Sequence, residues 1–272
     1  MKFAQYGDPN GRLVVYFHGV PGAIEECMVL DESAKQHNLR FICFDRFSLD
    51  ADSQGNDYYL SIADAIQEQA DDTAFDIVGF SLGCHVALKL SVLMRERVRQ
   101  LHLVSAAAPL ESGDYLDDMA GALVFKLAKN SPVAFAVLSY WQSLLCRLSP
   151  RFLYALIFAS AQAEDKSLSE EPGFQATLQR TLEQSYVQNL KGYMRDVREY
   201  VQPWQGLLKR CEGQTVLWHG AQDNWAPVAM ADLLAKELPH VIDVQMIDNA
   251  SHYSCLLNSV EGICQKLHSD NE

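Results

Sequence analysis

Ser81 stands at the centre of a sequence pattern that would make it a nucleophile. It lies between Gly79 and Gly83 in a small–X–Ser–X–small pentapeptide, after the apolar β-type run 75–78 and before a helical pattern. On such a strand–turn–helix the serine projects above the sheet edge only if the turn is very tight, and the glycines leave the room that a Cβ would fill. The backbone N–H of Leu82 would then face the space above the serine, where developing negative charge is stabilised.

Two further residues have the chemistry to activate this serine. A serine hydroxyl is a weak nucleophile until a base takes its proton, and the base is commonly a histidine that a carboxylate orients. His252 follows a strand pattern that ends near residue 247, and Asp223 follows the preceding strand pattern in the same way. We therefore predict Ser81 as nucleophile, Asp223 as acid and His252 as base. The other candidates for the acid are Asp248 and the cluster Asp114, Asp117 and Asp118.

Short β-type runs would bring these side chains together. The runs cover residues 12–17, 40–45, 75–78, 100–105, 214–218 and 241–247. Their apolar character is typical of buried parallel strands, and their alternation with helical patterns predicts an α/β fold with a mostly parallel sheet flanked by helices. Ligands bind such sheets at the carboxyl ends of the strands. Each candidate residue follows such an end, so we expect them to converge.

The segment 110–209 breaks this alternation. Its helical patterns cover residues 120–128, 133–145, 152–163, 174–190 and 193–201, without a β-type run between them. About a hundred residues of helix are too many for one crossover connection. We predict a core domain of residues 1–109 and 210–272 with an inserted helical cap (lid) of residues 110–209. The apolar residues of the cap would form its own core or line an acyl or alcohol pocket.

Four motifs together resemble the α/β-hydrolase superfamily, specifically its capped, esterase and proline-iminopeptidase-like branch. They are His18-Gly19-Val20-Pro21-Gly22, Gly79-Phe80-Ser81-Leu82-Gly83, His219-Gly220-Ala221-Gln222-Asp223 and Ser251-His252. The resemblance covers the whole chain and implies the triad Ser81, Asp223 and His252. It also implies an oxyanion hole made by the backbone N–H groups of Val20 and Leu82. Where the family commonly has Pro-Gly-X-Gly-X-Ser, this chain has Arg46-Phe47-Ser48-Leu49-Asp50-Ala51-Asp52-Ser53.

Composition, charge and cysteine content indicate which binding partners and which cellular compartment to expect. The formal charge of −13 argues against a nucleic-acid partner, because phosphate binding needs clustered Lys and Arg. Seven cysteines without C-x-x-C spacing, and an N-terminus without a signal-like apolar run, predict reduced thiols and a cytoplasmic location. No stable membrane insertion is expected, and a membrane-surface role is not favoured because no strongly basic face is evident. We expect no metal and no nucleotide cofactor, because neither metal-ligand spacing nor a phosphate loop is present.

The resemblance implies a serine hydrolase that cleaves small, fairly apolar carboxylic esters through an acyl-enzyme. A proline iminopeptidase, thioesterase or lactonase on the same triad is an alternative. An iminopeptidase needs acids to bind the substrate ammonium. The candidates for this role are Glu164, Asp165, Glu170 and Glu171. A further alternative, from another class, is a non-catalytic ligand-binding module on a hydrolase scaffold.

Overall fold

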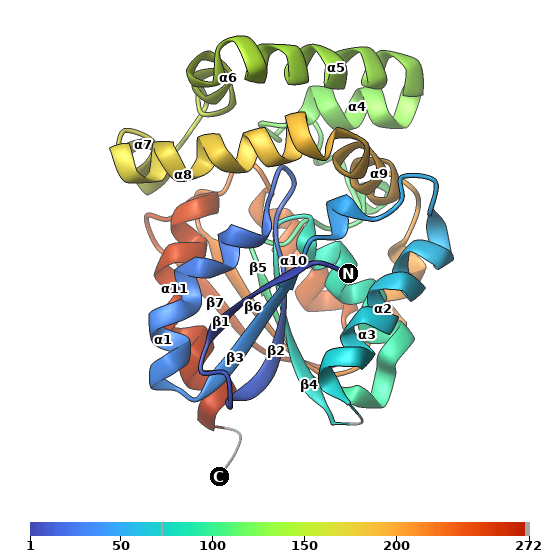
Figure 1. Ribbon diagram of the computed structural model, residues 1–272, viewed down its shortest axis with the longest axis vertical. Helices are drawn as coiled ribbons and strands as arrows, with labels where there is room; N and C mark the ends of the chain where they lie inside the picture. Colours follow the sequence, from blue (N-terminus) through green and yellow to red (C-terminus); the bar gives the residue numbers. More distant parts are fainter. Residues whose placement is uncertain (72, 270–272) are drawn as a thin grey trace.

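A seven-stranded sheet forms the centre of the molecule (Figure 1). The computed structural model describes residues 1–71 and 73–269, so residue 72 and the last three residues of the predicted core lie outside the described ones. In spatial order β1-β3-β2-β4-β5-β6-β7, β1 is antiparallel to β3 and the other neighbours are parallel. The strands are β1 (Phe3–Gly7), β2 (Arg12–Phe17), β3 (Leu39–Phe44), β4 (Phe75–Phe80), β5 (Val98–Val104), β6 (Gln214–Gly220) and β7 (Val241–Ile247).

Helices cover both faces of this sheet, as Figure 1 shows: α1 and α11 lie on one side, and α2 and α3 on the other. The α-helices of this part are α1 (Asp31–Gln36), α2 (Gly55–Ala70), α3 (Gly83–Met94), α10 (Val228–Glu237) and α11 (His252–Ser269). Short 3₁₀ segments cover Ile24–Leu30, Arg46–Ser48, Arg95–Arg97, Leu110–Ser112 and Gln205–Arg210. All six residues of β4 are buried because layers cover both of its faces. The predicted α/β fold is confirmed.

The remaining helices form a layer of their own above one end of the sheet (Figure 1). We call them the helical layer. They are α4 (Ala122–Asn130), α5 (Pro132–Leu148), α6 (Pro150–Ile157), α7 (Ala163–Leu168), α8 (Pro172–Glu183) and α9 (Leu190–Tyr200). This layer falls within the segment 110–209. That the segment is a separate cap stays a prediction.

Two helices of this layer differ from the sequence prediction. The predicted helix 152–163 begins earlier, at Pro150, and ends at Ile157. The predicted helix 174–190 is α-helical only to Glu183, and a π-helical turn, Gln184–Gln188, follows it. The spacing of apolar residues does not distinguish an α-helical turn from a single π-helical turn. Such π-helical turns are rare in proteins, and many of them lie at functional sites. Here the turn buries Ser185 and Tyr186.

Candidate active site

Ser81 lies on a tight turn between β4 and α3. Its φ of +55° is unusual for a residue with a side chain, and such strained backbone is concentrated at functional sites. The turn is closed by hydrogen bonds from Ser81 N–H to Val104 O (2.9 Å) and from Cys84 N–H to Ser81 O (3.0 Å). A Cβ on Gly83 would overlap the carbonyl oxygen of Phe17. Glycine is therefore required beside the serine for the steric reason that the sequence suggested.

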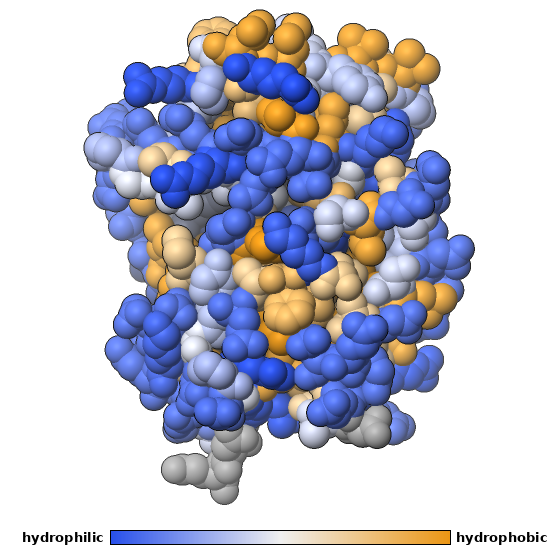
Figure 2. Space-filling view, in the orientation of Figure 1, coloured by the Kyte–Doolittle hydropathy of each residue, from blue (hydrophilic) through white to orange (hydrophobic). Residues whose placement is uncertain are grey.

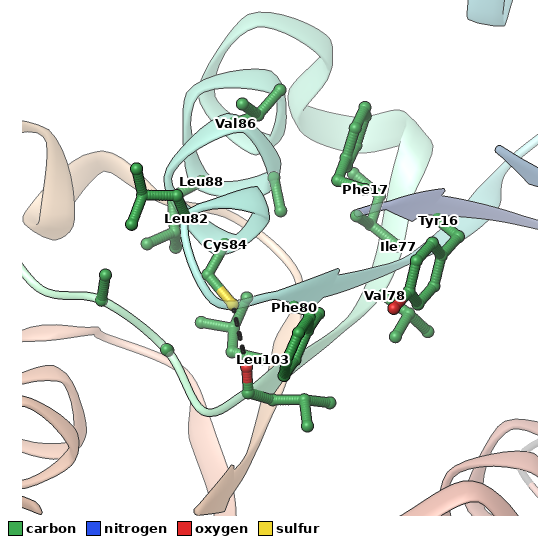
Figure 3. Packing of buried hydrophobic residues seen from close by; sticks show 14 of the residues in the cluster. Tyr16, Phe17, Ile77, Val78, Phe80, Leu82, Cys84, Val86, Leu88 and Leu103 are labelled. Carbon is green, nitrogen blue, oxygen red and sulfur yellow. Dashed lines mark hydrogen bonds between the residues drawn. The ribbon is translucent and has the colours of Figure 1, made fainter. Parts of the chain in front are cut away.

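Cys84 follows this turn and packs into the core. Figure 3 shows its side chain pointing from the start of α3 toward Phe80 and Leu103. Its thiol donates to the carbonyl oxygen of Gly79 at 3.1 Å, and burial raises the pKa of this thiol well above its ordinary value. A buried thiol that stays protonated is a poor nucleophile. Of the two side chains, Ser81 is the one that lines the cavity described below.

His252 and Asp223 form a buried hydrogen-bonded pair after the ends of β7 and β6. The imidazole Nδ1 lies 2.8 Å from Asp223 Oδ2. The other carboxylate oxygen accepts the backbone N–H groups of Trp225 and Ala226 at 2.8 and 2.9 Å. The His252 ring stacks on Trp225 with 5.7 Å between centroids and lies 4.8 Å from the ring of Phe80, the residue before Ser81. The carboxylate therefore orients the imidazole, whose Nε2 is left for another partner.

The charges of this pair favour an imidazolium. Burial disfavours protonated His252, but Asp223, with smaller contributions from Asp165 and Glu26, outweighs it and raises the pKa of His252. Burial also disfavours ionised Asp223, yet His252 outweighs it and lowers the pKa of Asp223. No hydrogen bond joins the Ser81 hydroxyl to His252 within the described residues. Such bonds are often long or poorly aligned without a ligand.

The backbone N–H groups of Val20 and Leu82 are available to a ligand. Both residues line the same cavity as Ser81. Within the described part of the chain, neither N–H donates to another residue. Two hydrogen bonds hold the loop at Gly19, the residue before Val20. Glu26 accepts the Gly19 N–H at 2.9 Å, and His18 Nδ1 donates to the Gly19 carbonyl oxygen at 2.9 Å. His18 therefore orders the loop.

A buried ion pair also holds this loop, and sequence reasoning did not find it. Arg46, which is fully buried, donates from Nε to Asp196 Oδ2 at 2.7 Å and from Nη2 to the carbonyl oxygen of His18 at 2.8 Å. Asp196 lies on α9 and also accepts the Tyr58 hydroxyl at 2.8 Å. The helical layer is thus tied to the loop of Val20. The only sequence signal was an arginine directly after a buried strand, in the segment that departs from the family pattern.

Asp165 joins the helical layer to the candidate base. This fully buried residue of α7 accepts the backbone N–H groups of His252 (3.1 Å), Tyr253 (3.0 Å) and Ser254 (2.7 Å), and also the Ser254 hydroxyl. These N–H groups begin α11, where a carboxylate is stabilising. Asp165 was one of the predicted candidates for an amine-binding acid, but its carboxylate already accepts the N–H groups at this helix end.

The other acids proposed from sequence lie elsewhere. Asp248 is exposed, as are Asp114, Asp117 and Asp118, and Asp117 pairs with Lys126 at 2.7 Å. Glu164 accepts from Asn258 at 2.7 Å, and Glu170 and Glu171 are exposed. Among the described residues no group of three His, Cys, Asp or Glu side chains is arranged to hold a metal ion.

A cavity of about 290 Å³ lies between Ser81 and the helical layer. Its wall carries neither an acidic nor a basic side chain. The polar members are Ser81, Gln142, Ser160, Tyr186 and Tyr193, and the larger apolar members include Leu123, Phe125, Trp141, Leu153, Leu156 and Val197. Burying an unpaired charge in such surroundings is costly, so the cavity suits a neutral, apolar group.

Comparison with known proteins identifies the family. The family model described as alpha/beta hydrolase fold matches residues 12–259, so the chain belongs to this family and is a hydrolase. No curated protein matches it in sequence. No helix within the described ranges has the length and apolar character needed to cross a membrane.

Solved structures show the same fold at low identity. The bromoperoxidase of Bacillus anthracis is 16% identical with a TM-score of 0.68, over 97% of this chain and 92% of that one. A thermophilic esterase of Thermogutta terrifontis is 15% identical with a TM-score of 0.67, over 98% and 91%. The proline iminopeptidase of Mycobacterium smegmatis is 14% identical with a TM-score of 0.67, over 98% and 94%. These likenesses concern the fold and leave the substrate open.

Proposed function

We propose that this hydrolase cleaves small, fairly apolar carboxylic esters with Ser81, His252 and Asp223 as its triad, under a cap formed by residues 110–209. The observation that carries the proposal is the 2.8 Å hydrogen bond between His252 Nδ1 and Asp223 Oδ2. It lies beside a cavity that Ser81 and the helical layer line together. A buried acid–imidazole pair next to a serine on a strained turn is the arrangement that acyl transfer requires.

In the proposed reaction His252 Nε2 takes the proton of the Ser81 hydroxyl while Oγ attacks the ester carbonyl carbon. The N–H groups of Val20 and Leu82 bind the oxyanion of the tetrahedral intermediate. His252 then gives its proton to the leaving alkoxide, and an acyl-enzyme forms. A water that His252 deprotonates attacks this acyl group, and collapse of the second intermediate releases the acid and returns the proton to Ser81. Asp223 stabilises the imidazolium in each half-reaction.

The cavity supports an ester over a substrate with a free amino terminus. Asp165 is occupied by α11, and none of Glu164, Glu170 and Glu171 is part of the cavity wall. A substrate ammonium would therefore be buried without a countercharge, which is unfavourable. We expect turnover of p-nitrophenyl esters and little turnover of a proline arylamide. Thioesters and lactones have the same electrophilic carbonyl and belong in the same substrate panel.

The experiment is the variant Ser81→Ala, assayed on p-nitrophenyl esters of graded chain length. Loss of a triad nucleophile lowers kcat by at least about a thousandfold. Ser61→Ala, whose hydroxyl makes only an exposed hydrogen bond to Asp57 O within α2, is the matched control and should leave kcat unchanged. A fluorophosphonate probe should label the wild type and fail to label Ser81→Ala. Turnover by Ser81→Ala near the wild-type rate would refute the assignment, whereas neither turnover nor labelling in the wild type would indicate a ligand-binding module.

A further inference from the structure

The outer face of α5 is apolar and has no covering element within the described chain. Val133 and Leu148, near its two ends, are 76% and 75% exposed. Residues spaced by three or four positions share one face of a helix. The exposed apolar residues of α5 follow this spacing and are Val133, Val137, Tyr140, Trp141, Leu144 and Leu148. Leu123 of α4 and Phe152 and Leu156 of α6 extend this surface, which we call the outer apolar face.

Figure 2 shows these apolar side chains gathered at the top of the molecule, over α5 and α6 as labelled in Figure 1. Large exposed apolar patches on soluble proteins mark interaction sites.

The charge around this face is opposite in sign to that of the whole protein. The chain carries a net charge of −13, yet residues 119–163 contain no Asp or Glu. Their charged residues are Lys126, Lys129, Arg147 and Arg151. Lys126 pairs with Asp117, whereas the other three are exposed and form no ion pair within the described part of the chain. The outer apolar face is thus bordered by unneutralised cations from three helix segments that pack together.

This face is continuous with the cavity above Ser81. Leu123, Trp141 and Leu156 are 61%, 49% and 46% exposed on the outside, and all three also line the cavity. A lipophilic molecule in contact with the outer apolar face therefore already touches residues of the cavity wall.

We propose that the outer apolar face binds an anionic phospholipid surface, on which α5 lies parallel to the membrane plane. Apolar side chains bordered by Lys and Arg bind such surfaces by burying apolar area and by attraction to anionic headgroups. A second copy of this chain fits less well, because a two-fold contact would bring the same cations together. A membrane-surface role was not favoured from the sequence because no strongly basic face was evident there. The fold assembles the basic border from α4, α5 and the start of α6.

Vesicle binding tests this proposal independently of catalysis, so Ser81→Ala should bind like the wild type. Cosedimentation with phosphatidylcholine vesicles is compared with vesicles that also contain phosphatidylglycerol. We expect binding to the anionic vesicles to be at least about tenfold tighter and to weaken as salt is raised. Equal affinity for neutral and anionic vesicles, or no binding to either, would overturn the proposal.

Matched variants locate the surface. The triple variant Lys129→Glu, Arg147→Glu and Arg151→Glu should lose about a hundredfold or more in affinity, since each cation contributes about fivefold. Val137→Ser, Leu144→Ser and Leu148→Ser, which lie outside the cavity wall, should lose at least about tenfold. The controls Lys209→Glu, Arg210→Glu and Lys236→Glu, and Ile242→Ser, Val244→Ser and Met246→Ser on β7, should bind like the wild type.

Two measurements keep the result clear if a variant folds poorly. In the wild type, brominated phospholipids should quench the fluorescence of Trp141, and Trp141→Phe should remove most of this quenching. Light scattering reports self-association. A wild-type dimer that the triple serine variant dissociates, without quenching by lipid, would show that a second copy covers this face and would refute the lipid proposal.

Discussion

Substitution of Asp165 by Asn tests whether the helical layer positions the candidate base. In the wild type Oδ2 accepts the N–H groups of His252 and Tyr253, and Oδ1 accepts the Ser254 N–H and hydroxyl. An amide nitrogen in place of Oδ2 would leave two buried N–H groups without an acceptor, at about 1–3 kcal/mol each. We therefore expect Asp165→Asn to lower the free energy of unfolding by about 2–6 kcal/mol. At about 2 °C per kcal/mol for a chain of this size, that corresponds to a Tm lower by about 4–12 °C.

The same substitution should move the pH dependence of activity. The carboxylate of Asp165 contributes to the raised pKa of His252, which burial alone would lower. Removal of this carboxylate lowers the pKa of His252. Because the base acts when deprotonated, the acidic limb of the kcat/KM profile should shift to lower pH.

The loss of folding stability in Asp165→Asn should also depend on pH, because Asp165 raises the pKa of His252. The folded-state pKa of His252 is raised, so its contribution is present below the unfolded pKa of 6.5 and is lost as pH rises through the folded pKa. The loss of stability in Asp165→Asn should consequently be larger at mildly acidic than at alkaline pH.

Glu164→Gln is the control for this experiment. Glu164 is the neighbouring residue of α7 and also contacts α11, through Asn258, but at an exposed position. Exposed contacts contribute about 1 kcal/mol or less. The assays are thermal unfolding and kcat/KM against pH with a p-nitrophenyl ester. If Asp165→Asn lowers the Tm no more than Glu164→Gln does, and leaves the acidic limb in place, Asp165 does not position His252.

Further predictions concern the turn of Ser81 and the loop of Val20. Arg46→Met removes the 2.7 Å ion pair of the buried Asp196 carboxylate and leaves only the longer contact of 3.6 Å with Arg195 Nε, so it should lower the free energy of unfolding by about 3 kcal/mol in chemical denaturation. The double variant with Asp196→Leu should regain much of this loss, and an equally unstable double variant would count against the ion-pair explanation. Gly83→Ala places a methyl group against the carbonyl oxygen of Phe17 and should cost about 2 kcal/mol or more, with loss of esterase activity; a stable, active variant would contradict the steric account. Burial raises the pKa of Glu26 from 4.5 to about 7, so the stability of the wild type falls as pH rises between these values, by at most about 3 kcal/mol. Glu26→Gln should therefore gain Tm relative to the wild type above pH 7 but not below pH 4.5, and a pH-independent difference would show that Glu26 titrates normally.

The sequence alone was enough to predict the six parallel strands of the sheet, though not the antiparallel edge strand β1, and the place of the candidate chemistry among them. Apolar β-type runs that alternate with helical patterns predict a covered parallel sheet, and such a sheet brings the carboxyl ends of its strands to one edge. Ser81, Asp223 and His252 each follow such an end, so chain order and strand positions were sufficient to group them. Gly79 and Gly83 lie within five consecutive residues around Ser81, so the sequence alone was sufficient to predict the tight turn. The roles of these residues stay predictions for Ser81→Ala to test.

The tertiary structure decided what surrounds this chemistry. Asp165 could not be distinguished from Glu164 by sequence, because the N–H groups that it accepts lie 87 to 89 residues further along the chain. Arg46 and Asp196 are 150 residues apart, and nothing local to either predicts a buried pair. The apolar spacing of α5 was visible in the sequence, but whether its face was buried or outward depended on which helices pack beneath it. Helices, strands and tight turns follow from patterns among neighbouring residues, so the sequence predicts them. Burial and charge pairing depend on distant segments that only the folded chain brings together.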